Sequence, residues 1–307
     1  MGGSTRLSWL GASVQVWGVY RGPAPLSRSG ASRLPAPFFT AGVGQEQEQE
    51  QEREVPVKIG TSGWQYRHWT GTFNPADLAM SRWLGFYAGC FDTVDVDSTF
   101  YRLPPADVFA RWREETPEGF VMAVKASRYL THRRRLREPR EPVARLVERA
   151  SHLGPKLGPV LVQLPPTMRV DTGRLDETLA SFPEGLRVAV EARDDSWDCD
   201  AVWELLARRG AAWCIADVPW RRWPVVRTAD WGYLRLHEGI ASPRPCYGRR
   251  ALAGWASRIA QTWPEGGDVY AYLTTSPAPA LPTTRSGSLP RAREKASGRA
   301  VCPGAER

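Results

Sequence analysis

The chain of 307 residues is 42% hydrophobic and 24% charged, as in a folded globular protein, and lacks the apolar run of about 18 residues that a membrane span needs. Its five cysteines form no CxxC pair, which argues against a zinc site or a disulfide framework and indicates the cytoplasm. The net charge is +8, but six basic against two acidic residues past Leu273 supply +4 of it, so nucleic-acid binding is not expected.

Three zones are predicted along the chain. Residues 1–54 include the polar tract QEQEQEQERE and are expected to be a disordered extension or translation from an upstream start, with a transit peptide as the alternative. Residues 55–273 are predicted to fold as one domain. Residues 274–307 are rich in Pro, Ser, Thr and Arg and are expected to be disordered.

Eight apolar runs of strand length recur in the middle zone. They cover residues 57–64, 93–101, 119–127, 158–166, 186–192, 211–219, 231–238 and 268–273. Runs that are apolar on both faces are typical of parallel strands that are covered on both sides.

Helical patterns separate most of these runs. They cover residues 81–90, 106–115, 140–153, 173–182, 198–210 and 250–263. The last one spaces Leu252, Trp255, Ile259 and Trp263 on one stripe, whereas the connection between the sixth and seventh runs lacks a clear helix. This alternation predicts an α/β fold of the TIM (β/α)8-barrel type. An open doubly wound sheet would alternate in the same way, but no Gly-rich fingerprint follows the first run, so no nucleotide cofactor is expected.

Polar residues lie where the predicted strands end, and TIM barrels carry their chemistry at that end of the barrel. In chain order these residues are Thr61, Ser62, Gly63, Trp64 and Tyr66; Asp97, Ser98, Thr99, Phe100 and Tyr101; Lys125 and Ser127; Gln163; Glu191, Arg193 and Trp197; Asp217; and Arg235 with His237.

The spacing of these residues predicts a shared lumen. Members of the pairs Glu191–Arg193, Arg235–His237 and Lys125–Ser127 lie two apart, so each pair projects from one face of its strand. Buried ionisable groups are costly unless they are paired or functional. The prediction is therefore an active site at the barrel mouth, and the alternative is an ion pair that only braces the barrel. Trp64 and Trp197 have a similar alternative, as packing at the rim.

Six motifs follow one another in the order found in the YecE-like family, which this chain resembles over about residues 56–273. The motifs are GTSGW with Tyr66 and Trp69, DSTFYRLP, VKASRYLTH, QLPP, EARDDSW and YLRLHE. The resemblance implies a TIM barrel of a family long classed as a domain of unknown function and described as related to sugar isomerases. It matches Thr61, Gly63, Trp64 and Tyr66, Lys125, Thr131 and His132, Glu191, Arg193 and Trp197, and Arg235 and His237 to family motifs.

Two departures from the family pattern affect this interpretation. The family usually has Asn at the position of Asp97, so this chain adds a charge there. The last strand of the family leads into two asparagines and a closing helix, whereas Leu273 is followed here by Thr274-Thr275-Ser276 and a Pro-rich tail. The hypothesis is a frame shift near residue 273, and translation of the other two reading frames of the coding DNA tests it.

These observations predict an enzyme that acts on a small polar substrate, carbohydrate-like or phosphorylated. Its catalytic residues would be Glu191 as general base or metal ligand, His237 as general acid/base, Lys125 and Asp217. Its substrate-binding residues would be Arg193, Arg235, Thr61, Trp64, Tyr66, Asp97, Tyr101, His132 and Trp197.

Three points are left open by the sequence. A divalent metal held by Glu191, Asp217 and His237 is one alternative, although no ligand spacing requires it. A hydrolase with Glu191 and Asp217 as its carboxylate pair is a second, and a non-catalytic ligand-binding or interaction barrel is a third. The oligomeric state is not predicted.

Overall fold

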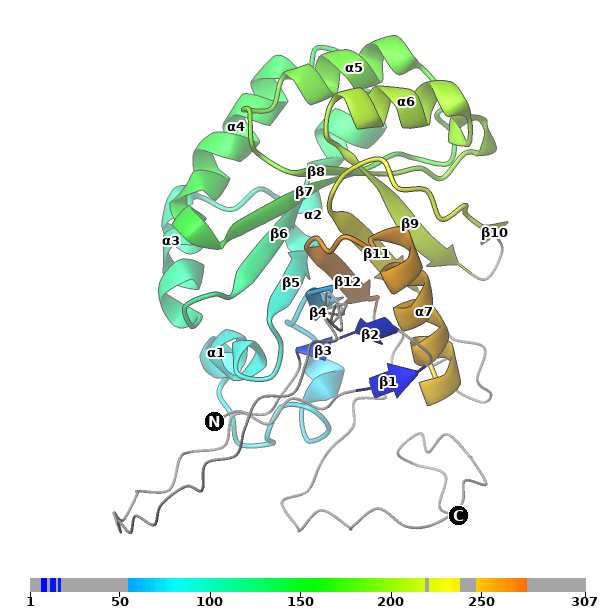
Figure 1. Cartoon of the computed structure of the whole chain (residues 1–307). Coiled ribbons are helices and arrows are strands. Elements are labelled where there is room, and N and C mark those ends of the chain that lie inside the picture. Colours follow the sequence, from blue (N-terminus) through cyan, green and yellow to red (C-terminus); the bar gives the residue numbers. More distant parts are fainter. Residues whose placement is uncertain are drawn as a thin grey trace, which may run out of the picture.

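Eight parallel strands close into a barrel in the computed structural model, which describes residues 55–218, 221–237 and 247–274 and the backbone of residues 7–9, 12–14 and 16–17 (Figure 1). The strands are β4 (Val57–Ser62), β5 (Thr93–Val96), β6 (Val121–Lys125), β7 (Leu157–Gln163), β8 (Val188–Glu191), β9 (Ala212–Val218), β11 (Gly232–Leu236) and β12 (Val269–Leu273). Pairing of β8 with β9 and of β12 with β4 leaves this ring without an edge. The predicted TIM-type barrel is confirmed, and the open sheet is excluded.

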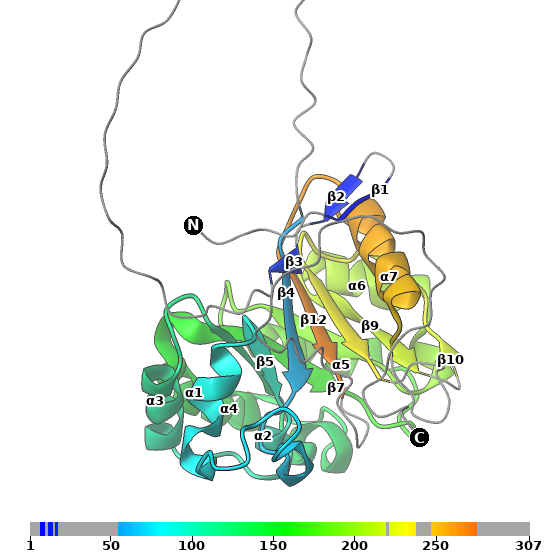
Figure 2. The same ribbon diagram turned by 90° about the horizontal axis from the view of Figure 1, so that it is seen from below.

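Helices lie on the outside of the barrel between successive strands (Figure 2). They are α1 (Trp83–Ala88), α2 (Ser98–Tyr101), α3 (Ala106–Glu115), α4 (Arg140–Ala150), α5 (Thr172–Ala180), α6 (Asp200–Arg208) and α7 (Arg249–Thr262). Single helical turns occupy Arg67–Trp69, Met80–Arg82, Tyr129–Arg133, Ser151–Lys156 and Asp195–Trp197. As expected, the described part of the β9–β11 connection holds no helix and instead forms β10 (Arg221–Arg222), antiparallel to β9.

The barrel interior is apolar at its middle and polar at one end. Buried side chains that include Ala123, Leu161, Ala189, Tyr233 and Tyr272 pack against one another inside it. Because successive side chains of a strand alternate between its two faces, the residue two positions further along faces the same lumen. Those positions are Lys125, Gln163, Glu191 and Arg235, at the C-terminal ends of their strands.

Two local predictions differ from the structure. The second apolar run was expected to be extended as far as residue 101, but residues 98–101 form α2, because the Thr99 hydroxyl binds the carbonyl oxygens of Val96 and Lys125, both at 2.8 Å. Leu252, expected on the buried stripe of α7, is 43% exposed. This helix packs through its C-terminal half, where Trp263 lies against the backbone of Gly232.

The two outer zones lie largely outside the described residues, so their predicted disorder stays a prediction. Toward the N-terminus, β1 (Leu7–Trp9) pairs with β2 (Ala12–Val14), and β3 (Val16–Trp17) pairs with β4. Residues 275–307 are not described, and the frame-shift hypothesis concerns them. Among the described helices, none has the length and apolar character needed to cross a bilayer.

Gly60 allows β4 and β5 to approach closely. A Cβ atom at this position would lie 2.0 Å from the backbone oxygen of Thr93. We expect Gly60→Ala to lower the free energy of unfolding by about 1–3 kcal/mol, because the two strands must separate. Urea unfolding of the full chain measures this. The matched control is Gly254→Ala in α7, where an added Cβ meets nothing within 4 Å and alanine favours the helix. Equal midpoints for the two variants would contradict the prediction.

Candidate active site

Arg235 is the centre of a buried charge cluster at the C-terminal end of the barrel. Its Nη1 lies 2.8 Å from Oε2 of Glu191, and its Nη2 lies 3.0 Å from Oδ2 of Asp95 and 3.2 Å from Oδ1 of Asp97. Ser62, the last residue of β4, links the cluster further, with its hydroxyl 3.2 Å from Oδ2 of Asp95. The guanidinium therefore joins the ends of four strands.

A second layer of charged side chains lies above this cluster. Nζ of Lys125 is 3.1 Å from Oδ1 of Asp97, and Nη2 of Arg193 is 2.6 Å from Oε1 of Glu191. Nε2 of His237 is 3.6 Å from the same Oε1. The side chains of Asp95 and Glu191 are 0% exposed and that of Arg235 is 2% exposed, whereas Lys125, His237, Arg193 and Asp97 are 8, 15, 21 and 32% exposed. The site thus has a buried lower layer, formed by Asp95, Glu191 and Arg235, and an upper layer that solvent reaches.

The pKa values of the two buried carboxylates are shifted in opposite directions. Burial raises the pKa of Asp95 to about 6; its neighbours Asp97 and Glu191 add to this, and Arg235 and Lys125 oppose it. Burial alone would also raise the pKa of Glu191, but Arg235, His237 and Arg193 together hold that pKa well below its usual range. Glu191 is therefore a permanent negative charge, and Asp95 can exchange a proton near neutral pH.

Asp95 is the site residue that the sequence interpretation missed. It precedes Asp97 by two residues, so both side chains leave the same face of the chain, and it pairs in register with Ser62 across β4 and β5. The same two-residue spacing that singled out Glu191 with Arg193 was present in the segment VDVD. The carboxylate was overlooked because it lies inside an apolar strand and not beyond its end.

Several predicted substrate-contacting residues are packed away from the charge cluster, in β4 or in the connections that follow β4 and β8. Thr61 faces outward, where its Oγ1 is 2.9 Å from the hydroxyl of Tyr87. Trp64 is buried and packs edge-to-face on Trp112 of α3, with 5.2 Å between the ring centres. Trp197 is fully buried, and its Nε1 donates to the carbonyl of Met168 at 2.7 Å. Packing accounts for these three side chains.

The remaining predicted contacts stay at the mouth or near it. The hydroxyl of Tyr66 donates to the backbone carbonyl of Ser62, beside the buried lower layer of the site. The Phe100 ring lies between Lys125, His132 and Tyr101, and Tyr101 is 79% exposed. Gln163 donates from Nε2 to Oε2 of Glu191 at 2.9 Å. The structure thus brings these residues close to the charge cluster.

The side chain of Asp217 makes no contact with the charge cluster among the described residues, and only its backbone carbonyl accepts a hydrogen bond from the backbone N–H of His237, at 3.1 Å. Its Oδ2 accepts hydrogen bonds from Tyr247 at 2.7 Å and from Trp255 of α7 at 3.3 Å. Its place in the chain explains this, because the inward positions of β9 are Ala212 and Cys214, and Asp217 has the opposite parity. The predicted pairing of Glu191 with Asp217 therefore has no contact to support it.

The donor set does not favour the predicted metal ligands. Within the described part of the chain, no group of three or more His, Cys, Asp or Glu side chains is arranged to hold a metal ion. Both oxygens of Glu191 already face guanidinium groups, Arg193 at Oε1 and Arg235 at Oε2. A cation at Glu191 would have to displace one of these positive charges.

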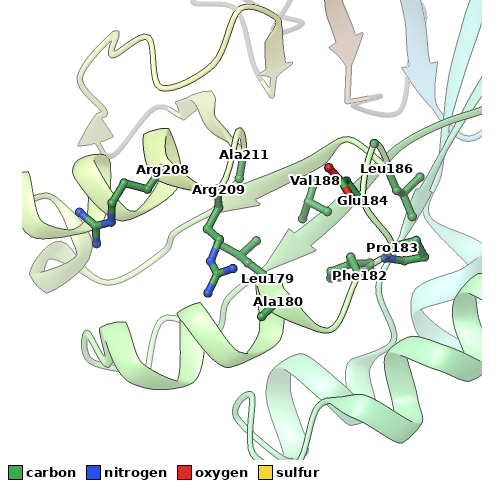
Figure 3. A pocket seen from close by; sticks show the side chains of 11 residues that line it. Leu179, Ala180, Phe182, Pro183, Glu184, Leu186, Val188, Arg208, Arg209 and Ala211 are labelled. Carbon is green, nitrogen blue, oxygen red and sulfur yellow. The ribbon is translucent and has the colours of Figure 1, made fainter.

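A separate cavity of about 370 Å³ lies at the other end of the barrel (Figure 3). It is lined by the C-terminal ends of α5 and α6 and by the loop that leads into β8, and Arg208, Arg209 and Glu184 are its charged residues. Arg209 is already paired with Asp176 at 2.7 Å. No residue of the charge cluster reaches this cavity, so it is not part of the candidate site.

Comparisons with known proteins agree on one family. Residues 58–287 match the family described as "Protein of unknown function DUF72". UPF0759 protein YecE of Escherichia coli K12 is 29% identical over 155 residues, which cover 50% of this chain and 54% of that protein. UPF0759 protein YunF of Bacillus subtilis strain 168 is 33% identical over 79 residues, 26% of this chain and 27% of that protein. The chain thus spans about half the length of YecE in this match.

Solved structures share the fold. A crystal structure of a DUF72 family protein from Thermotoga maritima MSB8 has a TM-score of 0.62 at 23% identity, over 71% of this chain and 92% of that one. A DUF72 family protein from Enterococcus faecalis V583 has a TM-score of 0.57 at 18% identity, over 72% of this chain and 90% of that one. At these identities the likeness concerns the barrel alone.

Proposed function

Because the chain belongs to the DUF72 family, which confirms its predicted YecE-like character, we propose a function from the site itself: an enzyme that transfers protons on a small polar substrate at the barrel mouth. The substrate class is carbohydrate-like or phosphorylated. The relation to sugar isomerases is part of this proposal and rests on the fold and on the acid–base groups of the mouth.

The layering of the charges is the observation that carries the proposal. Three cations (Lys125, Arg193 and Arg235) and three carboxylates (Asp95, Asp97 and Glu191) form one connected network. A single ion pair would be enough to brace the barrel, and well-packed apolar residues would often stabilise the fold as much without the free-energy cost of burying charges. A preorganised active site requires side chains that buried partners hold in place and that remain accessible to substrate, which is the arrangement found here.

His237 suits proton transfer better than Glu191 does. A carboxylate whose pKa is held well below its usual range is a weak base, so Glu191 is better suited to hold Arg193, Arg235 and His237 in place. His237 is 15% exposed, and its Nε2 faces the fixed charge of Glu191 at 3.6 Å. This contact fixes the orientation of the imidazole ring at the mouth.

An aldose–ketose isomerisation in this site needs no external oxidant or reductant, because it only moves protons within the substrate. His237 takes the proton from a hydroxyl-bearing carbon next to a carbonyl, and the electron pair of that C–H bond becomes the C=C bond of an enediolate. Lys125 and Arg193 stabilise the charge that develops on the carbonyl oxygen. The hydroxyl proton on the first carbon then moves to the former carbonyl oxygen, His237 returns its proton to the former carbonyl carbon, and the carbonyl is regenerated on the first carbon. Tyr101, which is 79% exposed, offers an aromatic face to a sugar ring.

The surroundings of this activity are also proposals. We place it in the cytoplasm, because the described cysteines Cys90, Cys199 and Cys214 are free. A small molecule is the partner proposed, with no membrane and no nucleic acid.

Deuterium exchange tests the proposal without knowledge of the product. The full chain is incubated in D2O with a panel of aldoses, ketoses and their phosphates, and incorporation at carbon is followed by NMR. We expect exchange with at least one substrate, and a loss of about 10²–10⁴-fold in His237→Gln, since that is the range of general acid–base catalysis.

Glu191→Gln and Asp217→Asn make the test specific. Glu191→Gln should lower exchange as well, because the charge facing His237 is removed, whereas Asp217→Asn should leave exchange unchanged. If a sugar or sugar phosphate binds but no carbon-bound proton exchanges, the mouth belongs to a non-catalytic binding barrel and the proposal fails.

A further inference from the structure

Two nitrogen-bearing side chains, Lys125 and His132, contact Phe100 on one side of the mouth, and Arg193 is a third one near His132. Nζ of Lys125 lies 4.6 Å from the centre of the Phe100 ring, and the ring of His132 packs edge-to-face on Phe100 at 5.0 Å. Arg193 approaches from the end of β8, close enough to act electrostatically on His132. The three residues come from β6, from the loop after it, and from the residues after β8.

Lys125 has more hydrogen-bonding capacity than its partners use. An ammonium group carries three donors, and the described contacts of Nζ are one carboxylate oxygen, of Asp97 at 3.1 Å, and the face of the Phe100 ring. Asp97 is shared, because the same Oδ1 also lies 3.2 Å from Arg235. The side chain is 8% exposed, so little water reaches it.

The ring of His132 is oriented by Thr131. Nδ1 lies 2.9 Å from the Thr131 hydroxyl, and that hydroxyl donates its proton to the carbonyl of Ser127 at 3.1 Å. With its proton on the Ser127 carbonyl, the hydroxyl accepts from Nδ1–H, and in that tautomer Nε2 of the neutral ring carries no proton. A proton taken up by His132 is added at Nε2, opposite the Thr131 contact.

Arg193 is only partly engaged. Its Nη2 faces Oε1 of Glu191 at 2.6 Å, while its Nε is buried and has no hydrogen-bond partner among the described residues. Glu191 also neutralises Arg235. Arg193 thus shares its carboxylate with Arg235, and Lys125 shares Asp97 with Arg235 in the same way.

The loop that carries His132 is held in an unusual backbone conformation. Residues 129–133 form a π-helical turn, a feature frequent at functional sites. Arg135, Leu136 and Glu138 then adopt left-handed conformations with φ of 50, 61 and 46°, which cost energy for residues other than glycine. Leu136 is fully buried and anchors the loop.

We propose that Lys125, His132 and Arg193 form a subsite for the oxyanion group of the substrate, a phosphate or a carboxylate. The inference rests on the proposed function, since it concerns the substrate of the same mouth. The oxyanion would accept hydrogen bonds from Nζ of Lys125, from the free donors of Arg193 and from protonated Nε2 of His132. Two or three oxygens of one group match donors that converge from separate elements.

Binding in this subsite is coupled to a proton. Burial, Lys125, Arg128 and Arg193 lower the pKa of His132 in the empty site. A bound oxyanion offsets the three positive charges, so it raises that pKa and a proton is taken up at Nε2. Affinity then falls as the pH rises, by up to about tenfold per pH unit for one coupled proton.

Calorimetric titration of the full chain with sulfate, phosphate and acetate tests the subsite. Sulfate remains a dianion at pH 6 and at pH 7.5, so any pH dependence of its affinity belongs to the protein. We expect tighter sulfate binding at pH 6 and proton uptake that is visible as a difference between buffers of unlike ionisation enthalpy. Tighter acetate than sulfate binding would identify a carboxylate group, and the reverse would identify a phosphate.

Variants assign the effect to the three residues. Lys125→Gln and Arg193→Gln should each weaken sulfate at least tenfold, and His132→Gln should abolish the pH dependence; Arg174→Gln on α5 is the matched control. His132 lies in a half-buried loop, so its variant keeps the test valid if the Lys125 variant misfolds.

Two results overturn the subsite: no anion binds, or sulfate affinity is the same in all three variants. Its failure can be distinguished from failure of the proposed function. If sulfate binds but no carbon-bound proton exchanges, the subsite proposal stands and the proposed enzymatic function fails. Deuterium exchange with neutral sugars by a chain that binds neither sulfate nor acetate retains the enzyme and removes the subsite.

Discussion

Arg235→Met should lower the free energy of unfolding by about 3–5 kcal/mol at pH 7, the range for breaking a buried ion pair from one side. The guanidinium lies within 3.2 Å of three carboxylates, and two of these, Asp95 and Glu191, are 0% exposed. Methionine fills a similar volume but leaves the carboxylates with no central positive charge. They must then take up protons to stay buried, so the deficit should shrink at pH 5. Urea unfolding at the two pH values measures both effects.

A second substitution shows whether charge or volume causes the loss. Adding Glu191→Gln to Arg235→Met removes one of the stranded carboxylates and should recover part of the stability. Arg209→Met serves as the surface control, because Arg209 pairs with Asp176 in the solvent, and its midpoint should stay where it was. If Arg235→Met unfolds like the native chain at both pH values, Arg235 does not hold the cluster together.

The barrel could be predicted from the sequence because its signals are local. Each strand is a short run that is apolar on both faces, and α3 begins and ends at the residues that the pattern gives, 106 and 115. Closure of the ring is a non-local fact, and it was favoured over an open sheet by the absence of a phosphate-binding fingerprint and by the family resemblance.

The site was predictable only in part, because it depends on which face each side chain occupies. The two-residue spacing brought Glu191 with Arg193 and Arg235 with His237 into the lumen, as the structure has them. The same rule, applied inside the strand, would have found Asp95. Asp217 was included for its position at a strand end, although its parity directs it to α7. Whether a side chain faces the lumen is therefore predicted better by its odd or even position in the strand than by its closeness to the strand end.

Stability of the native chain should fall as the pH rises from about 4 to 6, which is opposite to the behaviour that ion-paired carboxylates give. Asp95 has a pKa of about 6 in the folded protein against an ordinary 3.8. In that interval the folded state keeps a proton that the unfolded state has released, so the contribution is fully present below about pH 4 and is lost as the pH passes 6. A gap of about two pKa units corresponds to something on the order of 3 kcal/mol.

Glu191 produces the opposite slope at lower pH. Its pKa is held well below the usual range, so its contribution is present at neutral pH and is lost only as the pH falls through that low value. The two carboxylates together predict a stability maximum near pH 4. Urea unfolding between pH 4 and 7.5 should show the decline from about pH 4 to 6 in the native chain and in the control Asp217→Asn, and a flat profile in Asp95→Asn, which mimics the protonated acid. A slope that Asp95→Asn leaves unchanged would mean that another group binds this proton and that Arg235 keeps Asp95 ionised throughout.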